Sequence, residues 1–80
     1  MAYSREILID DGSATVYEVE NILQDALMRD RRDLPEVFLI DGPYDTQVLV
    51  DLTGEGLAEE DEMYEALYDV FGNSVDIVAP

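Results

Sequence analysis

The apolar residues of this chain follow two different spacings in turn, and the order of these spacings restricts the folds open to it. Successive side chains of a strand alternate between two faces, whereas residues three and four apart share one face of a helix. Alternation predicts strands at residues 3–10, 36–40, 46–52 and 74–78, and helical spacing predicts helices from residue 15 to residue 29 or 30 and over residues 59–72.

The first predicted helix has a clear start. Thr15 is followed three residues later by Glu18, the spacing of a capping box, so the helix is expected to begin there. Arg29, Arg31 and Arg32 cluster near its expected end, where cations interact favourably with the helix dipole. The alternative is that these arginines pair with carboxylates of the chain or of a partner. The buried face is predicted to carry Val16, Val19, Leu23, Ala26 and Leu27 with Ile22 beside them, and the outer face Glu18, Asn21, Gln24 and Asp25.

The second predicted helix, residues 59–72, combines an apolar face with an otherwise acidic surface. Acids in its first turn suit the helix dipole, and Gly72 provides a C-terminal stop. The acids beyond the first turn repel one another by roughly 0.2–0.5 kcal/mol per pair, so the helix itself gains nothing from them. Solvation or a partner is the expected reason for their presence. The apolar face is predicted to carry Met63, Ala66, Leu67, Val70 and Phe71, with Tyr64 and Tyr68 sealing its edge.

The predicted order is strand, helix, strand, strand, helix, strand, which is the split βαβ pattern. Right-handed crossovers would place both helices on one face of a four-stranded antiparallel sheet whose central strands are the first and third. Eighty residues suffice for one small domain. We therefore expect a single acidic α+β domain over residues 1–80, with a ferredoxin-like βαββαβ two-layer sandwich.

One face of such a sheet carries no helix. Alternation places Leu8 and Leu49 at the centre of this open face, ringed by carboxylates, with Phe38 or its neighbours added according to register. An exposed apolar patch on a small protein marks a partner site, and Leu49 is the candidate contact there. A homodimer that buries the same patch is the alternative. Tyr44, in the loop between the second and third strands, is a further candidate because tyrosine is enriched at interface hot spots.

The composition excludes several functions. Four arginines against twenty acids give a net charge of −16, which disfavours contact with nucleic acid or an anionic membrane and favours a basic partner. No Cys, His or Lys is present, so thiolate sites and histidine-based catalysis are excluded. The acids lie on predicted outer faces, without the apolar pocket that a catalytic carboxyl pair needs. Asp10, Asp11 and Asp41 fit no EF-hand spacing, so we expect no metal site. We likewise expect no enzyme activity and no cofactor.

The acids around the second helix suggest electrostatic mimicry of DNA. Residues three and four apart on a helix are about 5–6 Å apart, and duplex DNA carries about one charge per 1.7 Å of its axis. Glu18 and Asp25 on the first helix would form a sparser parallel row. Such a surface is expected to bind the cationic groove of a basic nucleic-acid-binding protein or complex. The predicted partner-binding row is Glu55, Glu59, Glu62, Glu65 and Asp69.

In size, acidity and lack of catalytic residues, the whole chain resembles phage-encoded DNA-mimic inhibitors, including the anti-CRISPR proteins. This resemblance of class implies a non-enzymatic inhibitor. With no predicted signal peptide or spanning helix, it is expected in the cytoplasm of a microbial host cell. The alternatives are an acidic protein–protein adaptor that uses the open sheet face, and a halophile-adapted domain. The absence of Lys fits a halophilic surface, whereas the concentration of seven acids between Glu55 and Asp69 does not.

Overall fold

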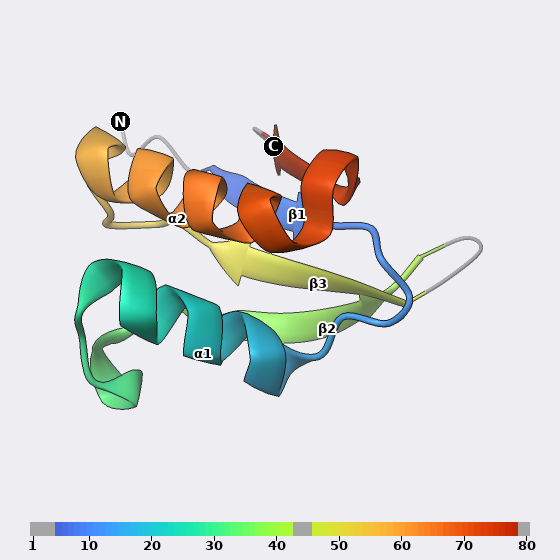
Figure 1. Ribbon diagram of the computed structural model, residues 1–80, viewed down its shortest axis with the longest axis horizontal. Helices are drawn as coiled ribbons and strands as arrows, with labels where there is room; N and C mark the ends of the chain where they lie inside the picture. Colours follow the sequence, from blue (N-terminus) through green and yellow to red (C-terminus); the bar gives the residue numbers. More distant parts are fainter. Residues whose placement is uncertain (1–4, 43–45, 79–80) are drawn as a thin grey trace.

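The computed structural model describes residues 5–42 and 46–78, and it shows an α+β fold. Four strands form one antiparallel sheet, and two helices lie side by side on one face of it and run in opposite directions (Figure 1). This arrangement is compatible with a ferredoxin-like fold. None of the helices in these residues is long and apolar enough to cross a lipid bilayer. In chain order the elements are β1 (Glu6–Ile9), α1 (Val16–Leu27), η1 (Arg31–Asp33), β2 (Val37–Asp41), β3 (Thr46–Asp51), α2 (Leu57–Phe71), η2 (Gly72–Ser74) and β4 (Val75–Val78).

The strand order is β2-β3-β1-β4, so β1 and β3 are central, as predicted. Ile7 pairs with Val50 in the register of these two strands, and both side chains are fully buried on the side of the helices. Leu8 and Leu49 face the opposite side of the sheet, because adjacent side chains alternate. Phe38 pairs with Leu49, so β2 contributes Phe38 to the open face, and the register that was undecided from the sequence is settled.

The core fills the space between the sheet and the two helices. The largest side chains of the core are fully buried. Complete burial of one such side chain contributes about 1.5–3 kcal/mol relative to its exposed state. The fully buried apolar residues include Ile7, Ile9, Val48 and Val50 from the sheet, Val19 and Leu23 from α1, and Met63 and Leu67 from α2.

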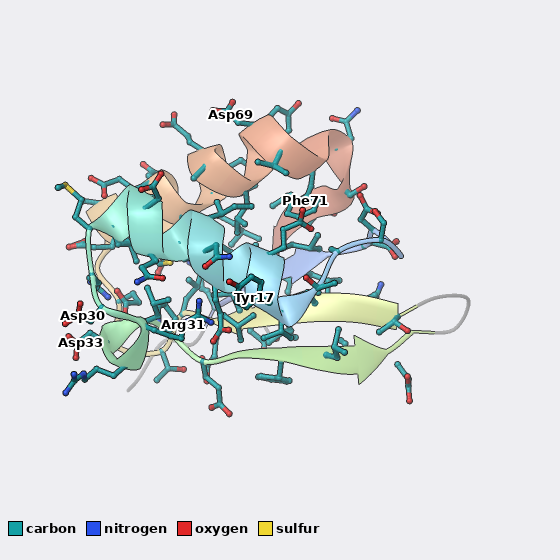
Figure 2. All side chains as sticks on the ribbon, turned by 60° about the horizontal axis from the view of Figure 1, so that its bottom comes forward. Tyr17, Asp30, Arg31, Asp33, Asp69 and Phe71 are labelled. Carbon is teal, nitrogen blue, oxygen red and sulfur yellow. The ribbon has the colours of Figure 1, made fainter. Side chains whose placement is uncertain are left out.

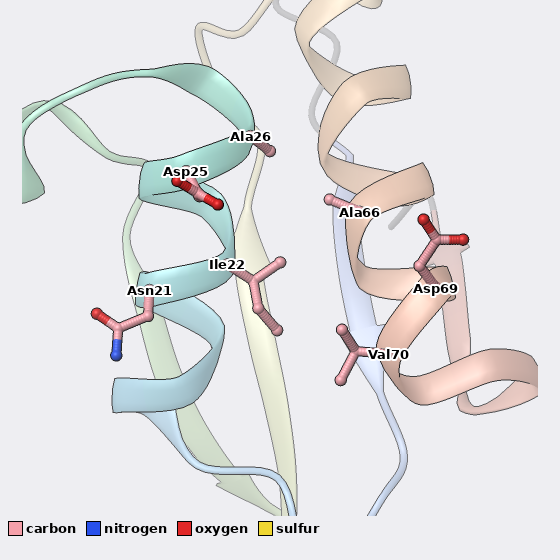
Figure 3. Close-up of a pocket in the computed structure, with 7 residues that line it drawn as sticks. All are labelled: Asn21, Ile22, Asp25, Ala26, Ala66, Asp69 and Val70. Atoms are coloured by element: carbon pink, nitrogen blue, oxygen red, sulfur yellow. The ribbon is translucent and has the colours of Figure 1, made fainter.

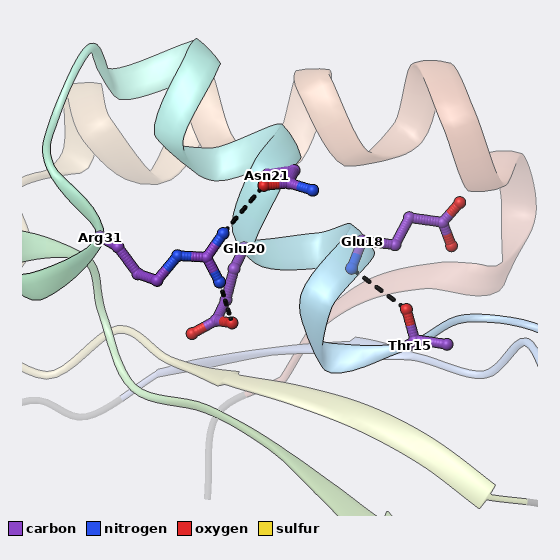
Figure 4. Close-up of polar contacts among 5 residues, drawn as sticks. All are labelled: Thr15, Glu18, Glu20, Asn21 and Arg31. Carbon is purple, nitrogen blue, oxygen red and sulfur yellow. Dashed lines mark hydrogen bonds and ion pairs between the residues drawn. The ribbon is translucent and has the colours of Figure 1, made fainter.

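Helix α1 begins where the capping box predicted. The Thr15 hydroxyl oxygen accepts a hydrogen bond from the Glu18 N–H at 3.1 Å, which satisfies one free donor of the first turn (Figure 4). The helix ends at Leu27, earlier than predicted, because Met28 adopts a left-handed conformation with a φ of 53°. Arg29 and the arginines after it therefore lie beyond the last turn, and the predicted dipole cap is wrong.

Helix α2 begins at Leu57, earlier than predicted, and ends at Phe71. Gly72 follows as the C-cap with a φ of 62°, a positive value that favours glycine, so the predicted stop is confirmed. Strand β1 begins at Glu6, so Arg5 of the predicted first strand lies outside it, and residues 3 and 4 lie outside the described residues. The other strand ends differ from their predicted positions by one residue at most.

The buried face of α2 is rotated from the predicted one. Met63 and Leu67 are buried as expected, but Glu60 takes the next position on the same line, one helical turn before Met63. Val70, which was predicted in the core, is 55 % exposed. Packing against the sheet sets this rotation, so that Ala66 and Val70 face the side on which α1 lies (Figure 3).

Candidate functional site

The exposed acids of α2 form a row on the side of the helix that faces away from the sheet. Asp61, Glu62, Glu65 and Asp69 are all exposed, and Asp69 is seen on the outer side of the helix in Figure 2. Spacings of three and four residues place these carboxylates on successive turns of one face. We refer to these four residues as the α2 acid stripe. Like charges at this spacing oppose helix formation, so the stripe does not stabilise α2.

Three ion pairs join described residues, and none of them involves the α2 acid stripe. Each pair joins an arginine to a carboxylate whose side chain is at most 25 % exposed. These arginines thus pair with acids whose side chains are largely shielded from solvent, whereas the four acids of the α2 acid stripe are exposed. The pairs are Arg5–Glu60 at 2.8 Å, Arg29–Glu55 at 3.1 Å and Arg31–Glu20 at 2.9 Å.

The predicted row of five acids is shorter in the structure. Glu55 does not face solvent with the others, because its carboxylate binds the Arg29 guanidinium, with Nη1 3.1 Å from Oε1. Glu59 folds back toward the start of the helix, where its Oε2 would lie only 2.9 Å from a Cβ atom at Gly56. The exposed part of the row is Glu62, Glu65 and Asp69, and Asp61 joins it.

Glu60 belongs to the predicted acidic surface of the second helix, residues 59–72, but the structure buries it. The residue is 6 % exposed, and its Oε1 lies 2.8 Å from Arg5 Nη2, although the two groups are not aligned as a hydrogen bond. This pair joins the first turn of α2 to the residue that precedes β1. Glu60 lies three residues before Met63 and seven before Leu67, which are both core residues. This helical spacing could have indicated that Glu60 is buried.

A groove lies between α1 and α2 (Figure 3). Asp69 of the α2 acid stripe stands on one side of it, and Asp25 of α1 stands on the other. Glu18, two turns before Asp25, is also exposed, so the predicted second row of acids faces solvent across the groove from the first. The groove is otherwise lined by Asn21 and by the apolar residues Ile22, Ala26, Ala66 and Val70.

The open face of the sheet is apolar at its centre, but Leu49 is not its exposed member. Leu49 is only 8 % exposed because it lies between Leu8 and Phe38 in the strand register. Phe38, at 37 % exposed, takes the place predicted for Leu49. Within the described residues, neither helix covers this face (Figure 1). Tyr44, the other predicted contact, lies outside the described residues.

Two tyrosines stand beside the α2 acid stripe. The ring centroids of Tyr64 and Tyr68 are 5.8 Å apart, and the ring planes are inclined by 31°. Tyr64 packs against the core, as predicted, and the Tyr68 hydroxyl donates a hydrogen bond to Asn73 Oδ1 at 3.1 Å. Together with Glu65 and Asp69, the tyrosines line a shallow hollow in the surface.

Two aspartates hold tight turns after β1 and β3. The Asp11 carboxylate accepts hydrogen bonds from the Ser13 N–H at 3.0 Å and hydroxyl at 2.7 Å, and Thr53 donates to Asp51 at 2.9 and 2.6 Å in the same way. The Ser13 N–H, then its hydroxyl, lowers the pKa of Asp11. The Thr53 hydroxyl, then its N–H, lowers the pKa of Asp51. No group of three or more acids in the described part of the chain is placed to hold a metal ion.

No family model, curated protein or solved structure matches this chain. Its own surface is therefore the guide to its function. Two regions are candidates for interaction: the acidic surface over α1 and α2, and the apolar sheet face on which Phe38 is exposed.

Proposed function

We propose that this chain is a non-enzymatic inhibitor that binds the cationic nucleic-acid-binding surface of another protein in place of DNA. The proposed class is the DNA-mimic inhibitors of anti-CRISPR type, acting in the cytoplasm of a microbial cell and built on a ferredoxin-like βαββαβ fold. The observation that carries the proposal is the separation of charge. The α2 acid stripe faces solvent, while the ion-paired arginines bind inner acids.

The density of charge on α2 is close to that of a DNA strand. Asp61 and Asp69 are eight residues apart, or about 12 Å along the helix axis at roughly 1.5 Å per residue. The stripe thus presents about one charge per 4 Å of axis, compared with about one per 3.4 Å for a single strand of duplex DNA. Release of condensed counterions would favour association with a cationic groove, and the affinity should fall steeply as salt is added.

The same charge supports a basic protein as the partner rather than nucleic acid or an anionic membrane. A net charge of −16 on 80 residues repels polyanions and attracts cationic surfaces. The commonest large cationic surfaces are those that hold nucleic acid. The inhibitor would therefore compete with nucleic acid for the protein and would not bind the nucleic acid itself.

A second candidate function is that of an acidic adaptor that binds its partner through the open sheet face. The exposure of Phe38 supports it, because aromatic side chains are common interface anchors. Asp76 is exposed beside Leu8 in the strand register, and like charges from a second copy would repel it. A partner with a basic rim is therefore favoured over a homodimer at this face.

Displacement of DNA from a basic protein tests the first proposal. RNA-guided nuclease effectors, each loaded with guide RNA and a fluorescent duplex, would be titrated with the chain at two salt concentrations. With four charges engaged, binding should weaken roughly 100-fold between about 50 and 200 mM salt. Fluorescence anisotropy measures the displaced duplex. A panel of such effectors that all retain their DNA at the lower salt would contradict the proposal, and an affinity of the chain for the effector that does not change with salt would contradict its electrostatic basis.

A further inference from the structure

The hollow beside the α2 acid stripe combines aromatic rings with carboxylates. Tyr64 and Tyr68 present rings with centroids 5.8 Å apart, and Glu65 and Asp69 place exposed carboxylates next to them. Tyr68 is 43 % exposed, and the 3.1 Å hydrogen bond from its hydroxyl to Asn73 restrains the ring. The rings are thus held beside two negative charges before any ligand binds.

The chain already binds one guanidinium group with the same kinds of side chain. The guanidinium carbon of Arg31 in η1 lies 5.1 Å from the centroid of the Tyr17 ring on α1. Its Nη1 donates to Glu20 Oε1 at 2.9 Å, and its Nη2 donates to Asn21 Oδ1 at 2.9 Å (Figure 4). One aromatic face, one carboxylate and one amide thus contact this arginine of the chain at the surface of the fold.

The hollow on α2 offers two rings and two carboxylates, and no ion pair or cation–π contact within residues 5–42 and 46–78 uses them. A guanidinium group suits this set better than an ammonium group, because it is planar, stacks on aromatic faces and can donate two parallel hydrogen bonds to a carboxylate. We propose that Tyr64, Glu65, Tyr68 and Asp69 form a subsite for an arginine of the basic partner. This inference rests on the proposed function and names the group that the acid surface recognises.

Two peptides that differ only in their cations test the subsite. Hexa-arginine and hexa-lysine would each be titrated into the full chain at low salt, with binding followed by NMR. An exposed cation–π contact corresponds to about a two- to fivefold gain in affinity, and hexa-arginine should bind more tightly by about that factor. The ring resonances of Tyr64 and Tyr68 should shift as hexa-arginine is added.

Substitutions in the hollow should remove the preference for arginine. Tyr68→Leu should abolish it and leave the hexa-lysine affinity unchanged, whereas Tyr68→Phe, which keeps the ring, should retain it. Glu65→Gln should weaken hexa-arginine binding more than Asp61→Asn does, because Asp61 belongs to the α2 acid stripe but does not line the hollow. Circular dichroism checks the fold of each variant, and the Glu65 and Asp61 comparison decides the matter if Tyr68→Leu does not fold.

Failure of the subsite and failure of the proposed function give different results. Equal affinities for the two peptides, with unshifted tyrosine resonances, would overturn the subsite. The proposed function would stand in that case if both peptides bound with a steep dependence on salt. If neither peptide bound at low salt, the subsite would be overturned and the proposed electrostatic recognition would be contradicted with it.

Discussion

Arg5 Nη2 lies 2.8 Å from Glu60 Oε1, so the residue that precedes β1 holds the first turn of α2. Arg29 acts in a similar way on the loop before α2, where it pairs with Glu55 at 3.1 Å. Both arginines thus serve contacts between distant parts of the chain. They pair with Glu60 and Glu55, and the acids of the α2 acid stripe remain exposed to solvent.

The coupling between Arg5 and Glu60 should be measurable as a contribution to the free energy of unfolding. Arg5→Met is expected to lower the free energy of unfolding by about 1–3 kcal/mol, because it leaves a buried carboxylate without its cation. The double variant Arg5→Met/Glu60→Leu should recover much of that loss, since apolar side chains can replace a buried ion pair. Urea unfolding at constant salt measures the single and double variants. Strictly additive effects would show that the two residues are not coupled.

Met28 offers a site where a substitution should stabilise the fold. It ends α1 with a φ of 53°, and its side chain is 91 % exposed. A left-handed conformation costs a residue with a Cβ about 1–2 kcal/mol, while the greater freedom of glycine in the unfolded chain offsets roughly 0.4–1 kcal/mol of the gain. Met28→Gly should therefore raise the free energy of unfolding by about 0.5 kcal/mol. Met28→Ala is the control, and an equal gain there would show that the backbone conformation is not the cause.

Local chemistry made the start of α1, the end of α2 and the faces of the central strands predictable. Thr15 has the side chain and spacing of an N-cap, and Gly72 can adopt the positive φ at which α2 ends. Alternation along the first and third strands placed Leu8 and Leu49 on the open face, and their neighbours Ile7 and Val50 are accordingly buried on the side of the helices. These features depend on residues that are close in the sequence, so they require no knowledge of the tertiary structure.

The rotation of α2 and the pairing of its acids depend on contacts between distant residues. Glu60 is a favourable first-turn acid, and the approach of Arg5 supplies the cation that its buried carboxylate needs. Glu55 pairs with Arg29 because the fold brings the end of α1 near the start of α2. Glu65 lies in the middle of the helix, away from these contacts, and its predicted exposure is correct.

The turn at Asp51 should contribute a stability that depends on pH. Hydrogen bonds from Thr53 lower the pKa of Asp51 below its ordinary value of 3.8 in the folded state. A carboxyl group with a lowered folded pKa stabilises the fold above its unfolded pKa, and the contribution is lost as pH falls through the lowered value. The stability difference between the unsubstituted chain and Asp51→Asn should be constant from about pH 7 to 5 and shrink below about pH 4. Denaturant titrations at each pH measure it, and an unchanged difference at acidic pH would contradict the assignment.

The dependence of folding on salt separates a directed acid surface from halophilic adaptation. Exposed acids also occur away from α2, at Asp10, Asp30 and Asp76, as a halophilic surface requires. A halophilic protein should unfold below about 0.5 M salt, because its acids lose their screening. With a directed acid surface, the chain should stay folded at about 0.1 M salt, with a melting temperature only a few degrees lower than at 1 M. Thermal melts followed by circular dichroism decide between the two explanations. A chain that is unfolded at the lower salt would favour halophilic adaptation.

The central claim is that the α2 acid stripe, and not net charge alone, competes with DNA. At about 0.1 M salt, charges further than roughly 10 Å from the contact are largely screened, so the position of the lost charges should matter. The direct measurement compares two variants in the displacement of labelled duplex from a cationic nucleic-acid-binding protein. One has the four acids of the stripe changed to Asn or Gln, and the matched control has the same change at the exposed acids Asp30, Glu36, Asp41 and Asp76.

The stripe variant is expected to displace DNA about 100-fold less effectively, while the control stays within a few fold of the unsubstituted chain. Equal losses in the two variants, or a stripe variant that displaces DNA as well as before, would contradict the central claim.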